Sequence, residues 1–249
     1  MRHNLRRAGI AAITLLVLIS SARALFETRD SKLQAVKTVG VISAVGDQFV
    51  FSKAGLTGFD NASRSVSIAA WALDDFFAEQ ATAMLSSRFQ VKPVSYPRAT
   101  FADISESPLK PVELISGDRF KKLVKTDVTP QGLDALVVIT RAKAEIGAGG
   151  RKAEGIGLVT YSTMTESYSA IHALYEIRVV DGKTFDVIEK LAAGPLDNST
   201  TLRLAGPSRL LEQGVPAGAD AASDEGLHRA VVDLITRSLP VTLEDMHLR

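Results

Sequence analysis

His172 and Glu176 are, by type and spacing, the residues best suited to acid-base chemistry. They stand four positions apart in a segment whose alternation predicts a strand, so both side chains belong to the same face of it. A histidine beside a carboxylate can act as a general base with an orienting partner. Leu174 lies between them on that face, so a direct contact needs a long reach. The alternative interpretation is a half-exposed histidine on a sheet.

Asp74 and Asp75 are the second candidate, a pair of neighbouring carboxylates in a predicted helix. Neighbours on a helix lie about 100° apart, so these two do not face each other. The helical pattern places Asp75 on the solvent side and Asp74 at the edge of the apolar stripe, beside Trp71. Asp74 is therefore the stronger candidate for a catalytic group. The alternative is a salt bridge at the boundary of the core.

Four basic residues surround a glycine-rich loop at 147–150 and form the candidate partner-binding site. They are Arg141, Lys143, Arg151 and Lys152. A basic loop on a chain whose net charge is negative once residues 1–24 are removed suits an acidic partner or an anionic polymer of the cell envelope. The alternative is a solvated loop whose charges keep a strand edge from aggregating.

Other chemical motifs lack the context that they require. Histidines 172, 228 and 247 have no metal-ligand spacing, so we predict no metal site and no cofactor. The glycines at 147–150 lack the Gly-Lys-Ser/Thr of a phosphate loop and join strands instead of opening a helix. No Gly-X-Ser-X-Gly elbow presents a serine nucleophile. The sequence therefore assigns no catalytic residue.

Hydrophobic periodicity predicts the elements that must position these side chains. Helices are expected over 68–88 with a cap at Ser65 or Ser67, over 112–124, and from Asp224, capped by Ser223, to Pro240. Strands are expected over 89–94 at an edge and over 134–140, 155–161, 169–180 and 183–192, with hairpin turns at Gly46-Asp47 and Asp181-Gly182.

These elements predict an α/β (α+β) fold. We expect a mixed β-sheet with hairpins at both ends and about three helices packed on it. One face of 169–180 is wholly apolar and should be core, while the other should be partly wet. The Gly- and Pro-rich stretch 194–222 predicts a long loop within a single domain over 25–249.

The first 24 residues have the pattern of a cleavable secretory signal. Three arginines within 1–7 precede an apolar run over 8–19, and Ala22 and Ala24 match a signal-peptidase site. The run is shorter than the roughly 20 residues that a membrane-spanning helix needs. We therefore expect cleavage, no membrane span in the mature chain, and a periplasmic or secreted location. A retained signal anchor is the alternative.

Charge and cysteine content narrow the functional classes. The chain has 29 Lys and Arg against 28 Asp and Glu, and four of the basic residues but no acid lie within 1–24. The mature chain is thus slightly acidic, which argues against nucleic-acid binding. The chain has no cysteine, so it forms no disulfide, carries no acylated cysteine and must rely on its core for stability.

The element order resembles a domain of bacterial envelope accessory proteins. The resemblance spans about 36–192 and rests on an early strand, a long helix, the strand Asp-Ala-Leu-Val-Val-Ile-Thr, a glycine loop, and the hairpin Tyr-Glu-Ile-Arg-Val-Val-Asp-Gly-Lys-Thr. That group includes the curli secretion lipoprotein, the penicillin-binding-protein activator lipoproteins and the N-terminal domain of the Tol-Pal β-propeller protein. The missing cysteine departs from its lipoprotein members. The resemblance implies assembly or assistance of envelope machines and assigns no site residue.

Two functions follow as hypotheses. The first is a periplasmic or secreted accessory or binding protein that acts through contacts with an envelope protein, with a homo-oligomer as a further option. The second is a periplasmic enzyme that uses His172 with Glu176, or Asp74, as its acid-base residues.

Overall fold

The computed structural model describes residues 29–54, 62–102, 119–146, 151–162, 167–196, 204–211 and 221–249. The chain divides into two compact units, Met1–Val36 and Lys37–Arg249. The described part of the first unit holds the short helix α2 (Arg29–Ala35). The proposed signal peptide at 1–24 lies outside the described residues and stays a prediction.

The second unit contains a five-stranded mixed sheet, which we call sheet A. Its order is β11 (Val187–Ala192), β10 (Tyr175–Asp181), β5 (Ala135–Arg141), β1 (Thr38–Ala44) and β4 (Gln90–Lys92). β5, β1 and β4 run parallel, and β10 is antiparallel to both of its neighbours. β5 is central and its first six residues are buried, as its continuous apolar sequence predicts. β4 is an edge strand, also as predicted.

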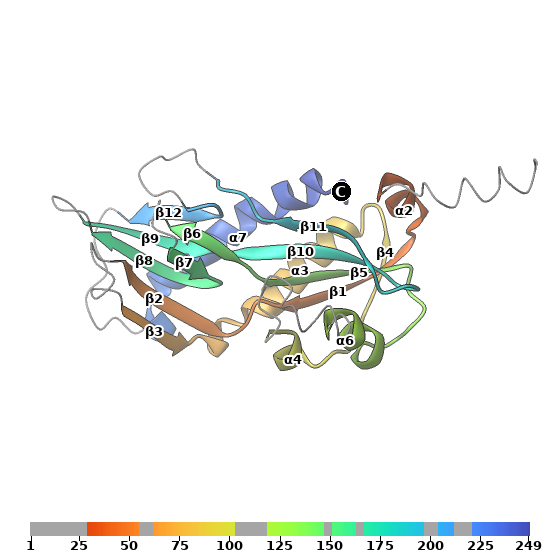
Figure 1. The fold of residues 1–249 in the computed structure, drawn as a ribbon, viewed down its shortest axis with the longest axis horizontal. Coiled ribbons are helices and arrows are strands. Elements are labelled where there is room, and N and C mark those ends of the chain that lie inside the picture. Colours follow the sequence, from red (N-terminus) through yellow and green to blue (C-terminus); the bar gives the residue numbers. More distant parts are fainter. Residues whose placement is uncertain are drawn as a thin grey trace, which may run out of the picture. The chain divides into compact units, whose positions relative to one another are not determined.

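A second five-stranded sheet, sheet B, lies beside sheet A, and the chain passes back and forth between the two (Figure 1). Its order is β12 (Ser208–Leu211), β9 (Ser167–Ala173), β8 (Ile156–Ser162), β2 (Gln48–Ala54) and β3 (Ala62–Ser67). A separate hairpin joins β6 (Lys143–Ile146) to β7 (Arg151–Glu154). The α/β class with mixed strand pairing is therefore confirmed, although the strands that the structure describes form two five-stranded sheets and a hairpin instead of one sheet.

The chain crosses between the two sheets at two places where the sequence predicts a hairpin or an uninterrupted strand within one sheet. The predicted hairpin at Gly46-Asp47 is wrong, because β1 belongs to sheet A and β2 to sheet B. Gly46 does have a positive φ of 97°, but the bend redirects the chain and does not fold it back. The single strand predicted over 169–180 is likewise two strands, which Leu174 separates. The backbone N–H of Leu174 donates to the Gly155 carbonyl oxygen at 2.9 Å, outside both sheets' ladders.

Other predicted connections change as well. The 147–150 loop, itself outside the described residues, connects β6 and β7, whereas β5 and β8 lie in different sheets. The hairpin after Asp181 is confirmed as β10–β11, but its turn extends to Asp186, whose carbonyl oxygen accepts the Asp181 N–H at 2.9 Å. Strand β12 lies within the predicted 194–222 loop and pairs with β9.

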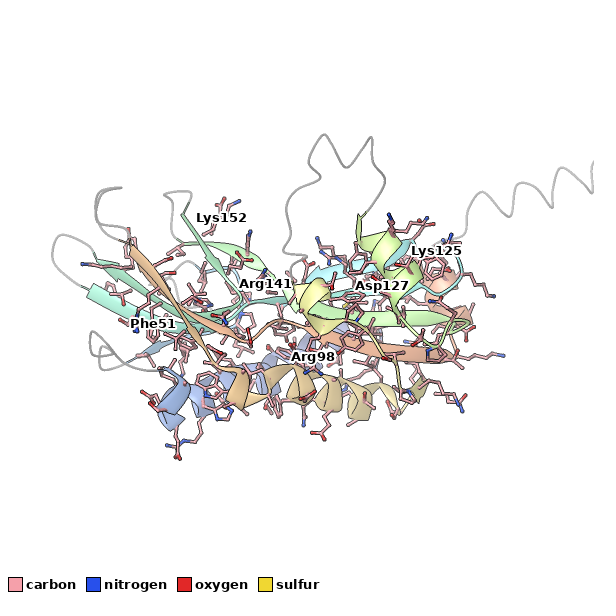
Figure 2. The ribbon with its side chains drawn as sticks, turned by 90° about the horizontal axis from the view of Figure 1, so that it is seen from below. Phe51, Arg98, Lys125, Asp127, Arg141 and Lys152 are labelled. Carbon is pink, nitrogen blue, oxygen red and sulfur yellow. The ribbon has the colours of Figure 1, made fainter. Side chains whose placement is uncertain are left out.

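Helices cover opposite faces of sheet A. On one face α3 (Leu73–Leu85) packs on β1, and α7 (Glu225–Asp245) packs beside α3 and also contacts β9 of sheet B. The short 3-10 turns η2 (Ala69–Trp71) and η3 (Ala221–Ser223) contact each other, and η3 also contacts β3 of sheet B. On the other face of sheet A lie α4 (Arg98–Ala102) and α6 (Arg119–Asp127) (Figure 2). Phe101 of α4 and Leu123 of α6 pack with Ile42 and Val138 of the sheet in one core cluster.

The amphipathic helix predicted over 68–88 is confirmed as η2 and α3, but its cap differs. Ala72 is the N-cap of α3, has a φ of 48° and makes no side-chain capping bond. In α7 the cap is Asp224, whose carboxylate accepts the Leu227 N–H at 3.0 Å, and not Ser223.

Helix α7 also continues five residues past Pro240, where the sequence predicts its end. A proline in a helix removes its own N–H bond and disfavours the turn before it. Here the buried face of α7, which includes Leu239 and Leu243, packs on both sides of the proline and stabilises the last turns. Tertiary packing therefore overrides the local stop signal.

Tyr175 ties β10 to both helices of this face. Its ring centroid lies 4.9 Å from that of Phe77 in α3, and its hydroxyl lies 2.8 Å from the Ser238 hydroxyl in α7. Burial raises the pKa of Tyr175 to about 12, so the phenol stays protonated. We expect Tyr175→Phe to lower the free energy of unfolding by about 1 kcal/mol, because it removes one buried hydrogen bond and keeps the ring packing. Urea unfolding measures this. A loss above about 3 kcal/mol would mean that the phenylalanine ring repacks.

Among the described residues, none of the helices has the length and apolar content of a membrane span.

Candidate functional site

The parallel strands place a cleft at their carboxyl ends. The chain passes from β1 to β4 on one side and then returns to β5 on the other side of β1, with α3 and α6 on opposite faces. In open α/β sheets, ligands bind outside the carboxyl ends of the strands at such a switch point. A cavity of about 510 Å³ opens there, lined by Gly46 after β1 and by Arg141 at the end of β5. This volume is in the range of ligand pockets. We call it the polar arm.

The floor of the polar arm is one face of the β2–β3 pair. Val50 stands opposite Ser65, and Ser52 stands opposite Ser63, so the hydroxyl groups line one surface. The Ser65 hydroxyl donates to Gln48 Oε1 at 2.8 Å, and the Gln48 amide donates to Asp47 Oδ1 at 3.0 Å. These bonds orient the Gln48 side chain. The floor is therefore an ordered row of polar groups.

The wall of the polar arm comes from the β6–β7 hairpin and the end of β5. Arg141 Nε lies 3.1 Å from Glu154 Oε1, and Lys143 Nζ lies 3.2 Å from Glu154 Oε2. Lys152 is exposed and also lines the cavity. Glu154 is thus a single carboxylate held by two cations, and the wall carries a net positive charge. Figure 2 shows Arg141 at the junction of the sheets and Lys152 on the hairpin.

A second cavity, the alanine arm, adjoins the first. It has a volume of about 360 Å³ and shares Gly46, Asp47, Ala99 and Ala102 with the polar arm. Its remaining lining is mostly apolar and comes from η2 and the start of α3, with residues Ile68, Ala69, Ala72 and Leu73. The short alanine side chains leave this space open. We call the two adjoining arms together the cleft; one arm is rich in polar and charged groups, and the other is mostly apolar.

Asp74 lies at the base of the alanine arm, where it holds the β1–β2 crossover in place. Its Oδ1 accepts the Ser43 hydroxyl at 2.9 Å and the Val45 N–H at 2.7 Å, and its Oδ2 lies 3.4 Å from the Gly46 nitrogen. The carboxylate is buried. The predicted boundary salt bridge is wrong, because these partners are a hydroxyl and two backbone amides. With its oxygens engaged in this way, Asp74 has a positioning role in the fold.

Arg98 lies at the rim of the alanine arm. Its Nη2 atom lies 2.6 Å from Asp75 Oδ1, and this contact raises the pKa of Arg98. Both side chains are largely exposed, so the pair adds little stability. The prediction that Asp75 faces solvent is confirmed.

His172 and Glu176 are not brought together. His172 belongs to β9, and its Nδ1 lies 2.9 Å from the Gly155 carbonyl oxygen, to which it donates in the neutral ring. Burial lowers the pKa of His172 to about 4, so the ring is uncharged near neutral pH. The predicted half-exposed state is wrong for this residue, which is 1% exposed. This face of β9 is core because Ala153 of the β6–β7 hairpin packs with Ala170 in one apolar cluster.

Glu176 lies in β10 with its own set of partners. It forms ion pairs with Arg178 and with Lys190 of β11, the latter at 3.3 Å, and stands opposite Thr140 in the sheet. Burial raises the pKa of Glu176 to about 7, against the opposing effect of Arg178. Arg178 in turn stacks over the Phe120 ring of α6 at 4.8 Å. The predicted wet face is therefore wrong here too, because α6 covers it.

The cleft contains two of the four basic residues predicted from sequence. Arg141 and Lys152 line the polar arm, whereas Lys143 contacts it only through Glu154. Arg151 is the first residue of β7. Four residues of the floor were not predicted as site residues from the sequence: Gln48, Ser52, Ser63 and Ser65. Their signal was the alternation of polar residues in two short strands, which predicts a wet face but not a cleft. No group of three or more potential metal ligands occurs in the part of the chain that the structure describes.

Comparisons with known proteins add a distant structural similarity. No known family profile matches the sequence, and no curated protein matches it. The chain is similar to the crystal structure of lipoprotein GNA1162 from Neisseria meningitidis, with 13% sequence identity and a TM-score of 0.28. The match covers 82% of this chain and 99% of that one. A similarity of this size assigns no function, so the proposals below rest on the residues of this chain. The resemblance to envelope accessory proteins stays a prediction.

Proposed function

We propose that this protein is a periplasmic or secreted accessory protein of the bacterial cell envelope, which binds a protein partner through the cleft between its two sheets. The observation that carries the proposal is the position of Arg141 and Lys152. Both are candidate partner-binding residues on sequence grounds, and both line the polar arm at the switch point of sheet A. The signal-like segment at 1–24 supports an extracytoplasmic location.

The lining of the cleft favours a binding function over catalysis by His172, Glu176 or Asp74. A contact site needs accessible charge beside an apolar surface, and the polar and alanine arms supply both. His172 and Glu176 line neither arm. Asp74 lines the alanine arm, but its carboxylate accepts bonds from the β1–β2 crossover.

Crosslinking in the intact cell envelope tests this function. The mature protein with a C-terminal tag should capture a specific partner, and a variant with Arg141→Ser and Lys152→Ser should lose most of it. The matched control replaces Lys122 and Lys125, two exposed lysines of α6, with serine. The control removes the same charge, so the partner should be retained.

The outcomes separate specific from general effects. Equal loss of the partner in both variants would show that net charge alone drives the capture. Full retention in the cleft variant would overturn the proposal that the partner binds at the cleft. Circular dichroism of each variant, which should match the wild type, excludes misfolding as the cause of a loss.

A further inference from the structure

The two arms of the cleft differ in chemistry, and this difference limits the chemical class of ligand that the cleft can bind. The polar arm offers hydroxyls, an oriented glutamine and both cationic and anionic side chains, whereas the alanine arm is mostly apolar, with Asp74 and Arg98 also in its lining. Gly46, Asp47, Ala99 and Ala102 belong to both arms, so one ligand can extend from one into the other. An extended ligand with both a charged and an aliphatic group fits this surface better than either group alone.

The polar arm contains Arg141 and Lys152 together with Asp47 and Glu154, and the two cations are the groups that would meet an acidic group on the ligand. Glu154 already forms ion pairs with Arg141 and Lys143, at 3.1 and 3.2 Å, and its side chain is about one-third exposed. A ligand carboxylate that approaches Arg141 and Lys152 would therefore compete with Glu154 for the Arg141 guanidinium. A cationic ligand would instead be attracted by Glu154. Substitution of Glu154 thus has opposite effects on the two ligand classes.

We propose that the cleft binds an extended acidic peptide segment of the partner, with a glutamate or aspartate against Arg141 and Lys152 and an aliphatic side chain in the alanine arm. This rests on the proposed function and specifies its ligand. Asp47, which lies where the arms meet and is exposed, accepts backbone N–H groups of the bound segment. Glu154 limits the affinity, because it must share its cations with the ligand carboxylate.

Defined peptides test the ligand class directly. The probe is a fluorescein-labelled set of blocked octapeptides with one leucine followed one to three positions later by one glutamate, all other positions being glycine or serine. One control set replaces the glutamate with lysine, and another replaces the leucine with glycine. Fluorescence anisotropy with the mature full-length protein measures the dissociation constants. We expect the leucine–glutamate set to bind about tenfold more tightly than either control.

Variants of the cleft should change this binding in opposite directions. Arg141→Gln should weaken binding of the leucine–glutamate set about tenfold, and Glu154→Gln should tighten it about threefold. Ala69→Leu, at a residue that lines the alanine arm and not the polar arm, narrows the alanine arm and should remove the preference for leucine over glycine while the preference for glutamate persists. Lys125→Ser, on the exposed surface of α6, should leave all constants unchanged.

The result that overturns the peptide proposal is weaker binding by Glu154→Gln, or equal binding of the glutamate and lysine sets. If the envelope partner is still lost in the Arg141 and Lys152 variant while these peptides fail to bind, the accessory function stands and the acidic-peptide ligand is wrong. If the partner is retained in that variant and the peptides also fail, both proposals are wrong.

Discussion

Replacing Asp74 with alanine is expected to lower the free energy of unfolding by about 3 kcal/mol or more, because the substitution leaves the Val45 N–H and the Ser43 hydroxyl buried without their acceptor. Each such group costs about 1–3 kcal/mol. Asp74→Asn keeps one acceptor oxygen but turns an N–H donor toward the other partners, so a smaller loss of about 1–2 kcal/mol is expected. Chemical denaturation monitored by the fluorescence of Trp71 measures both.

Asp75→Ala provides the matched control for this prediction. It removes a carboxylate from the adjacent position of α3, where the ion-pair partner is the exposed Arg98. We expect a loss of at most about 1 kcal/mol, since exposed ion pairs contribute little. If Asp74→Ala and Asp75→Ala cost the same, Asp74 does not hold the crossover. The Asp74→Ala variant should also change the cleft, because Asp74 fixes the position of Gly46, which lines both arms.

The second large effect is a dependence of stability on pH from Glu176. Its pKa rises from an ordinary 4.5 to about 7 in the folded protein, so between these values the folded state binds a proton that the unfolded state has lost. The contribution of Glu176 to the free energy of unfolding therefore falls as the pH rises through this window, by up to about 1.4 kcal/mol per pH unit. Relative to wild type, Glu176→Gln should gain stability on the order of 3 kcal/mol between pH 4.5 and 7.

His172 has the opposite effect. Its pKa falls from 6.5 to about 4 on folding, so the unfolded state binds the extra proton and the free energy of unfolding rises with pH between these values. His172→Gln should therefore lose this rise relative to wild type. In wild type the contributions of His172 and Glu176 largely cancel between pH 4.5 and 6.5. Each single variant should expose the slope that the other residue produces.

Urea unfolding of wild type, Glu176→Gln and His172→Gln at closely spaced pH values across both windows tests both signs. A constant offset between curves reflects changed packing, so the difference in slope is the informative quantity. Parallel curves for Glu176→Gln and wild type would show that Arg178 and Lys190 keep Glu176 ionised throughout. Parallel curves for His172→Gln and wild type would show that water reaches the imidazole.

The sequence by itself predicted the elements whose signals are local. The apolar run at 134–140 became the central strand β5, and the helical stripe after Ile68 became η2 and α3. The turn after Asp181 joins β10 to β11. The grouping of Arg141 with Lys152 was also visible, because both flank one short loop. Each of these features depends on the spacing of residues that are near one another in the chain.

Only the tertiary structure decided which sheet each strand joins. The alternation over 169–180 runs through Leu174 without interruption, so nothing in its period marks the change from β9 to β10. The crossover after β1 depends on Asp74, a residue 29 positions beyond Val45. Likewise, the β9 face that carries His172 is covered by the hairpin β6–β7, and α6 lies over Arg178 on the β10 face that carries Glu176. Period two identifies the faces of a strand but not what covers them.

The residues of the cleft likewise divide into those that the sequence predicted and those that only the tertiary structure brought together. Its basic wall was predictable, but its floor required β2 and β3 to pair beside β8, and its apolar arm required α4 to lie next to the start of α3. Serines and alanines occur throughout the chain, so their type alone carries no signal for a site. Local patterns determine an element and its polar face because backbone geometry fixes their period. The site exists only where long-range pairing and packing set those faces against one another.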